Sequence, residues 1–271
     1  MRDLDEALRL DPQLGWAYRI RGIVYVSRGG YDRAIRDFDR AIQLGWNKLE
    51  AYYWRAEAYR RWGREQQAIS DATEAINLQH DFGEAYYIRG RAALRIGRWA
   101  NALDDFTRVL ALDSSHRAAN LLRSIIHLGL GRPDAAVADA EAHLRRRGWL
   151  DRKAPCAAFL VYLASREARR EGDARRILEE AWRRSGGSSG NNWPKPIIRY
   201  LCREIPADIL LAGASDHQRV TEAHTYIGMD LSRSTRVPEA MKHLHWVRER
   251  GERESIERDL ALVELRRLEG K

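Results

Sequence analysis

Apolar residues recur along the chain at the three- and four-residue spacing of amphipathic helices. The pattern runs from Tyr18 to Leu44 and is interrupted by glycine near its middle, so it reads as two helices joined by a short turn. It returns 34 residues later as Tyr52 to Leu78 and again as Tyr86 to Leu112, with a weaker fourth copy from Asn120. A helix pair repeated at this period predicts a stacked array.

Small residues hold equivalent places in each copy. The first helix carries one where a partner helix must approach closely, at Gly22, Ala56, Gly90 and Ser124. A glycine suited to a left-handed helix cap separates the two helices, at Gly29, Gly63, Gly97 and Gly131. The second helix repeats an alanine and then a larger or smaller apolar residue, at Ala34/Phe38, Ala68/Ala72, Ala102/Phe106 and Ala136/Ala140.

This pattern resembles the tetratricopeptide repeat, a helix-turn-helix unit of 34 residues. The positions that carry the likeness in the first copy are Tyr18, Gly22, Tyr25, Ala34, Phe38 and Ala41. The resemblance implies an all-α fold, a right-handed superhelical solenoid of antiparallel helix pairs. It also implies a protein that binds other proteins.

Arginine and aspartate recur with the same period. Each arginine precedes its aspartate by 16 residues, in the pairs Arg21/Asp37, Arg55/Asp71, Arg89/Asp105 and Arg123/Asp139. Both members lie eight residues from the turn glycine, so they face each other in an antiparallel hairpin. We predict four structural salt bridges, because an arginine fork can bind a carboxylate with two hydrogen bonds. A row of phosphate-binding arginines is the less favoured alternative, since such a row would not need the aspartates.

The period also suggests domain bounds. We expect a repeat array over 1–150, made of a half-repeat at Met1–Leu10 and four repeats, then a degenerate helix pair over 151–184. The glycine- and serine-rich stretch 185–192 is typical of a flexible linker. A C-terminal module over 193–271 resembles the tail of some bacterial tetratricopeptide proteins through Thr221–Gly228, and this likeness suggests a bacterial source. Its last helix, 255–268, resembles the solvating helix that closes such arrays.

The first helices should line the inner face of the array, where a partner would bind. Side chains one position beyond the hairpin contacts point toward that groove, namely Trp16, Arg19, Ile23, Tyr53, Trp54, Arg60, Tyr87, Arg91 and Arg95. Tyrosine, tryptophan and arginine are common energetic anchors of interfaces, so an acidic and aromatic partner segment fits best. The alternative, that these aromatic rings pack between neighbouring repeats, is equally compatible with the period.

Composition narrows the function further. The net charge of +8 is concentrated between Arg145 and Arg184, where 12 basic residues face 6 acidic ones. Such a patch allows nucleic-acid binding, but a solvated helical face is the favoured interpretation because base-reading motifs are missing. The sequence contains no apolar run long enough to span a bilayer. Two distant cysteines and an acidic, amphipathic start favour the reducing cytoplasm.

The sequence offers no recognisable catalytic motif. Its eight histidines show no metal-ligand spacing, and neither a phosphate-binding loop nor a nucleophile elbow occurs. We therefore expect no enzyme activity, no cofactor and no metal. A regulatory arm of a larger multidomain enzyme is a second possibility, which the half-repeat at the start favours. The oligomeric state does not follow from the sequence.

Overall fold

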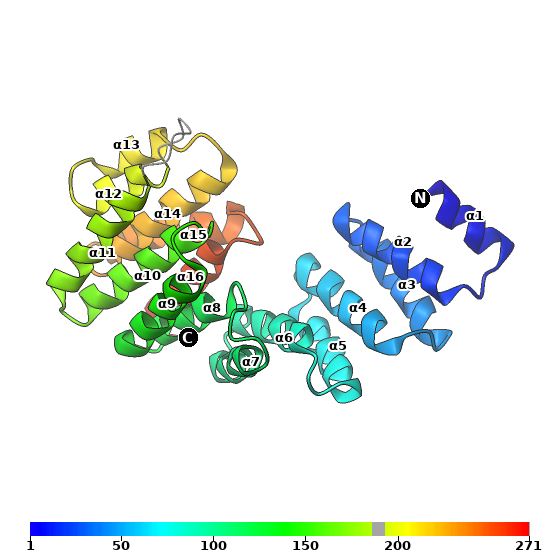
Figure 1. Ribbon diagram of the computed structural model, residues 1–271. Coiled ribbons are helices and arrows are strands. Elements are labelled where there is room, and N and C mark those ends of the chain that lie inside the picture. Colours follow the sequence, from blue (N-terminus) through cyan, green and yellow to red (C-terminus); the bar gives the residue numbers. More distant parts are fainter. Residues whose placement is uncertain (186–192, 271) are drawn as a thin grey trace. The chain divides into compact units, whose positions relative to one another are not determined.

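The computed structural model describes residues 1–185 and 193–270, and this part of the chain contains 16 helices and no strand (Figure 1). The predicted all-α fold is therefore confirmed. Except for Ser185, the predicted linker 185–192 lies outside the described residues. The chain divides into two compact units, Met1–Ser114 and Ser115–Lys271, which we call unit 1 and unit 2.

Unit 1 is a regular stack of helical hairpins. Its helices are α1 (Arg2–Leu10), α2 (Gly15–Ser27), α3 (Tyr31–Gln43), α4 (Lys48–Trp62), α5 (Glu65–Leu78), α6 (Gly83–Arg95) and α7 (Trp99–Leu112). Helices α2/α3, α4/α5 and α6/α7 pair as hairpins, and α3 packs on α4 as α5 does on α6. Three of the predicted repeats thus form one helical solenoid, and α1 lies before them against α2.

Glycine makes each hairpin turn possible. Gly29, Gly63 and Gly97 have φ angles of 75°, 83° and 83°, a left-handed conformation that side chains with a Cβ atom disfavour. Each turn therefore ends the first helix within one or two residues and reverses the chain. The predicted turn positions are those at which the structure turns.

Side-chain size is matched across each hairpin. A Cβ atom added to Gly22 would lie 2.7 Å from the Phe38 ring, and one added to Gly90 would lie 3.0 Å from Phe106. The second hairpin uses the opposite solution, because Ala56 packs on Ala72. Glycine thus accompanies phenylalanine, and alanine accompanies alanine, at the same close approach of two helices.

Unit 2 begins with two hairpins and ends with a third. Its helices are α8 (Ala119–Gly129), α9 (Pro133–Arg147), α10 (Ala154–Glu167), α11 (Glu171–Arg184), α12 (Lys195–Leu201), α13 (Ala207–Ala212), α14 (His217–Leu231), α15 (Val237–Arg250) and α16 (Ile256–Leu268). The last helix, α16, packs on α14 and α15 and also on α8. The end of unit 2 therefore returns to its beginning, and the unit closes on itself.

Two features of unit 2 follow from this closure. The fourth repeat, α8/α9, belongs to the compact unit 2, and α8 packs on α10 and α16. Helix α16 buries Leu260 and Val263, which the sequence places on its inner face, and it also buries Glu264. The predicted bounds 1–150, 151–184 and 193–271 remain a proposal based on the sequence period.

Candidate partner-binding surface

The four periodic arginines bind the aspartates with which the sequence pairs them. Arg21 donates to Asp37 through Nε and Nη2, at 2.9 Å and 2.8 Å, and Arg55 donates to Asp71 with both contacts at 2.7 Å. Arg89 and Arg123 bind Asp105 and Asp139 in the same way. All four aspartates are buried. Each contact therefore joins the two helices of one hairpin from inside.

Three of these arginines, Arg21, Arg55 and Arg89, also reach the preceding repeat. Arg21 Nη1 donates to Asp5 at 2.9 Å, Arg55 Nη1 donates to Asp39, and Arg89 Nη1 contacts the Thr73 hydroxyl at 3.3 Å. These acceptors lie 16 residues before each arginine, so a second search at the same spacing could have found them. One guanidinium thus joins a hairpin internally and ties it to its neighbour, which accounts for these arginines without a phosphate ligand.

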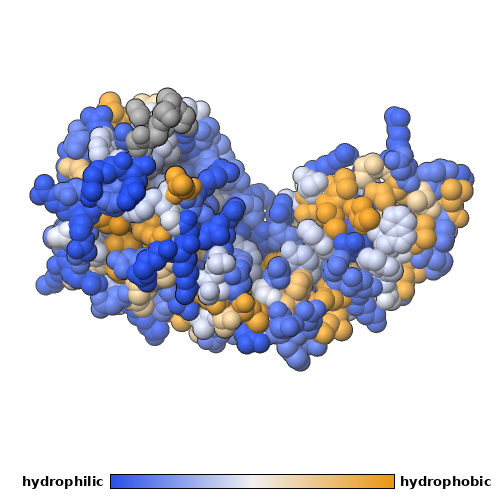
Figure 2. Space-filling model, in the orientation of Figure 1, coloured by the Kyte–Doolittle hydropathy of each residue, from blue (hydrophilic) through white to orange (hydrophobic). Residues whose placement is uncertain are grey.

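Helix α2 presents the most accessible of the predicted groove residues. Trp16 is 41% exposed. Arg19 lies over the Trp46 ring at 5.1 Å and pairs with Glu50 at 2.7 Å, while Ile23 packs partly on the core of the first hairpin. Ile20, half-buried one turn after Trp16, belongs to the same face, although the sequence reasoning missed it. Figure 2 shows hydrophobic side chains gathered over α2. We call Trp16, Arg19, Ile20 and Ile23 the α2 surface.

The aromatic residues of α4 serve the packing of the array. The Tyr53 ring meets Trp54 edge-on at 5.1 Å and Phe82 at 5.3 Å, and it packs on a cluster that includes Ile88. Burial, followed by the charge of Glu57, raises the pKa of Tyr53 to about 12. Trp54 packs on the core of the first hairpin. For these two rings the structure favours the packing interpretation.

Three arginines assigned to partner binding are interior residues. The Arg60 side chain is 3% exposed and binds Glu57 with two hydrogen bonds, at 2.8 Å and 2.9 Å. Burial alone would raise the pKa of Glu57, but hydrogen bonds from Arg60 and a neighbouring arginine hold that pKa below its usual value. Arg95 is buried 3.6 Å from Glu65. Arg91 is buried with its guanidinium 6.0 Å from the half-buried Tyr87 ring.

This burial corrects the assignment of Arg60, Arg91 and Arg95. The helix period places them near the groove, but the structure buries their side chains. A buried cation that has lost its partner is costly, so the ion pairs of Arg60 with Glu57 and of Arg95 with Glu65 belong to the structure of the array.

Several arginines of the basic stretch between Arg145 and Arg184 form ion pairs with nearby acidic residues. Exposed ion pairs one helical turn apart join Arg145 to Glu141, Arg175 to Glu179, Arg176 to Asp173, and Arg183 and Arg184 to Glu180. The arginines are spread over α9, α10 and α11 rather than along one helix. This arrangement supports the solvated-face interpretation.

Hairpins of equal length, stacked with one period and one glycine turn each, define a helical-repeat solenoid. The family model of the tetratricopeptide repeat matches residues 21–79 and 87–152. The matched residues are tetratricopeptide repeats. Arrays of this family are generally non-catalytic scaffolds for protein interactions.

Several solved structures share the fold. MamA is 22% identical over 63% of this chain and 91% of its own, with a TM-score of 0.58. YrrB, described as a TPR protein with an unusual peptide-binding site, is 15% identical over 74% and 98%, with a TM-score of 0.59. A tetratricopeptide repeat protein from Parabacteroides merdae is 14% identical over 93% and 98%, with a TM-score of 0.62. A comparison with proteins of curated function gives no match.

Two further observations concern residues 1–185 and 193–270. No helix there has the length and apolar character needed to cross a bilayer. No group of three or more histidine, cysteine, aspartate or glutamate residues in these ranges is arranged to hold a metal ion.

Proposed function

We propose that this chain is a non-catalytic protein-interaction scaffold and that a segment of a partner protein docks on the first helices of unit 1, centred on the α2 surface. The observation that carries the proposal is the exposure of Trp16 beside half-buried Ile20 and Ile23 on one helix face. Large aromatic side chains at the centre of an interface contribute most of its binding energy.

The chemistry of the partner follows from Arg19. Its pair with Glu50 lies at the surface, where the Glu50 side chain is partly exposed. Such pairs contribute on the order of 0–1 kcal/mol, so a partner carboxylate can displace Glu50 at little cost. An acidic segment with an apolar or aromatic side chain therefore fits the α2 surface. The peptide-binding site ascribed to YrrB supports the idea that this fold can take such a segment.

Site-specific photo-cross-linking tests this proposal. A benzophenone amino acid at position 20 should cross-link a partner in lysate of the source cells. The same group at position 36, an exposed site on α3, is the matched control. We expect capture of a partner by the cross-linker at position 20 but not at position 36. Adding Trp16→Ala and Arg19→Ala to the chain with the cross-linker at position 20 should lower the amount captured about tenfold. Equal capture at both positions, or capture indifferent to the double variant, contradicts the proposal.

Nuclease treatment separates the nucleic-acid alternative from this scaffold role. Capture that disappears with nuclease assigns binding to the Arg145–Arg184 stretch. No described contact specifically favours a regulatory arm of a larger enzyme. Reduced Cys156 and Cys202 are compatible with the expected cytoplasmic location, which remains a proposal.

A further inference from the structure

Unit 2 contains a cleft that the proposed function does not use. It lies between α10, α11 and α12 and has a volume of about 800 Å³. Part of its wall is apolar and comes from two helices, with Ala174, Leu178 and Trp182 from α11 and Ile198 and Leu201 from α12, while the rest carries charged side chains. Trp182 is partly exposed, so the wall is open to a ligand. Clefts of this size that combine apolar and polar side chains are typical of binding sites.

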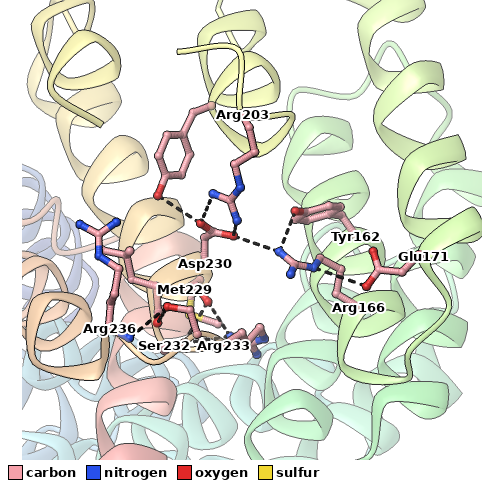
Figure 3. A network of polar contacts seen from close by, with 12 residues as sticks. Tyr162, Arg166, Glu171, Arg203, Met229, Asp230, Ser232, Arg233 and Arg236 are labelled. Carbon is pink, nitrogen blue, oxygen red and sulfur yellow. Dashed lines mark hydrogen bonds and ion pairs between the residues drawn. The ribbon is translucent and has the colours of Figure 1, made fainter. Parts of the chain in front are cut away.

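A cluster with excess positive charge stands at one end of the cleft. Asp230 of α14 is only 2% exposed and accepts hydrogen bonds from Arg203 at 2.6 Å and 2.9 Å and from Arg166 at 3.1 Å (Figure 3). The Tyr200 hydroxyl also donates to it, at 3.2 Å. Two guanidinium groups thus share one carboxylate. The cluster carries one positive charge that Asp230 does not balance.

A second carboxylate, that of Glu171, lies near Arg166 but forms only a weak ion pair with it. Glu171 lies 3.9 Å from Arg166 Nε, beyond hydrogen-bond distance, and its side chain is 74% exposed. Figure 3 shows Arg166 between Asp230 on one side and Glu171 on the other, with Tyr162 beside it. Because a buried or half-buried guanidinium gains most from a close, planar carboxylate, Arg166 is suited to a carboxylate supplied by a ligand.

The rim of the cleft carries further cations, whose ion pairs are exposed to solvent. Arg175 and Arg183 line it, and each forms an exposed pair with a glutamate of its own helix. Lys195 lies 4.9 Å above the Trp182 ring. The acids of the lining, Glu171, Glu179 and Glu204, have exposed side chains that can move into solvent. Exposed pairs of this kind contribute about 0–1 kcal/mol, so a ligand carboxylate can replace them.

We propose that this cleft is a second recognition site, for an acidic segment of a partner protein that carries a large apolar side chain. The apolar side chain packs on Leu178, Trp182 and Leu201, and the flanking carboxylates pair with Arg166 at the inner end and with Arg175 and Arg183 at the rim. The site lies wholly in unit 2 and does not depend on the α2 surface. A chain with both sites joins two segments at once, and each segment raises the effective concentration of the other.

Fluorescence anisotropy with a labelled peptide tests the proposal. The probe is a six-residue peptide with tryptophan and leucine at its centre and two aspartates on each side. Arg175→Glu combined with Arg183→Glu should weaken binding about tenfold, because two cations of the rim become repulsive. The matched control is Arg176→Glu with Arg184→Glu, which makes the same charge change on the same helix outside the cleft lining. We expect the control to remain within about twofold of the native chain.

Two further comparisons separate the outcomes. A probe with asparagine in place of aspartate should bind about tenfold more weakly if carboxylates are recognised. Because the α2 surface should also take an acidic, aromatic peptide, the titrations are repeated in a Trp16→Ala/Arg19→Ala background. The tenfold effect of Arg175→Glu with Arg183→Glu should persist there, which distinguishes this cleft from the α2 surface. Equal weakening by the two charge-reversal variants would reduce the effect to general electrostatics and overturn the proposal. Saturable binding to the native chain that disappears in the Trp16→Ala/Arg19→Ala background would also overturn it, while leaving the proposed function of unit 1 standing.

Discussion

Both units contain networks of arginine and aspartate, but the ratio of the two residues is reversed between them. In unit 1 one arginine holds two acceptors, as Arg55 holds Asp71 of its own hairpin and Asp39 of the preceding one. In unit 2 one aspartate, Asp230, holds two arginines. The partners in unit 1 are 16 residues apart, whereas Asp230 is 64 residues from Arg166 and 27 from Arg203.

This difference explains what each unit can do. Contacts between neighbouring hairpins leave an array open along its length, with a repeated surface that a partner can follow. Contacts between distant segments instead close unit 2 and surround a cleft. The second acceptors in unit 1 satisfy its arginines internally, whereas Asp230 is shared by two arginines, which is the basis of the binding site proposed for unit 2.

The largest expected effect is the loss of Asp230. Asp230→Ala leaves Arg166 and Arg203 without their shared carboxylate, and breaking such a buried ion cluster costs about 3–5 kcal/mol. Hydrogen exchange measured by mass spectrometry should show lower protection in α10 and α14 and unchanged protection in α2–α5. As a control, combining Asp230→Leu with Arg166→Met and Arg203→Met should restore much of the protection. Unchanged exchange in α10 and α14 would show that the cluster does not hold unit 2 together.

Within unit 1, the loss of unfolding free energy on removing an aspartate should depend on the second hydrogen-bond acceptor of its arginine. Asp105→Ala leaves Arg89 with the Thr73 hydroxyl, so we expect a loss of about 3 kcal/mol. Asp71→Ala leaves Arg55 with the Asp39 carboxylate, so we expect only about 1–2 kcal/mol. Urea unfolding of the two variants, followed by circular dichroism, measures the difference. An equal loss would mean that contacts to the preceding repeat contribute little.

Unit 2 should also respond to pH in a way that unit 1 does not. Burial, followed by the charge of Glu257, raises the pKa of Glu222 to about 7, from a usual value of 4.5. The folded state therefore binds more protons than the unfolded state between these values, and stability falls as pH rises through 7. We expect a loss of about 2–3 kcal/mol between pH 5 and pH 8.

The variant Glu222→Gln isolates this effect. It should remove the pH-dependent loss and make unit 2 more stable than the native unit at pH 8. Hydrogen exchange of α14 and α16, corrected for the intrinsic pH dependence of exchange, reports it. A native-to-variant difference that does not change with pH would exclude Glu222 as the titrating group.

The smallest effect tests the matched sizes across the hairpins of unit 1. Gly22→Ala places a Cβ atom 2.7 Å from the Phe38 ring, and overpacking of this kind costs about 1–3 kcal/mol. In the presence of Phe38→Ala, which recreates the Ala56/Ala72 arrangement, the added methyl group should cost about 1 kcal/mol less. A double-mutant cycle in urea provides the measurement. Strict additivity would contradict the size match.

The sequence predicted unit 1 better than unit 2 for a physical reason. Turn glycines, matched sizes and Arg–Asp pairs depend on residues within one hairpin, so a 34-residue period contains them. Arg60, Arg91 and Arg95 were misassigned because helix spacing gives a direction but not the depth at which the next helix covers a side chain. Asp230 and its arginines gave no periodic signal, since their partners lie in unrelated segments.

The sequence by itself therefore determined the helix pairs, their turns and the repeat family. It did so because local spacing and the absence of a side chain at glycine constrain the backbone directly. Only the tertiary structure decided that α16 returns to α8, that Tyr53 packs between hairpins, and that two arginines gather on Asp230 beside a cleft. Those outcomes depend on burial and on charges that are distant along the chain, and these become definite only when the helices have packed.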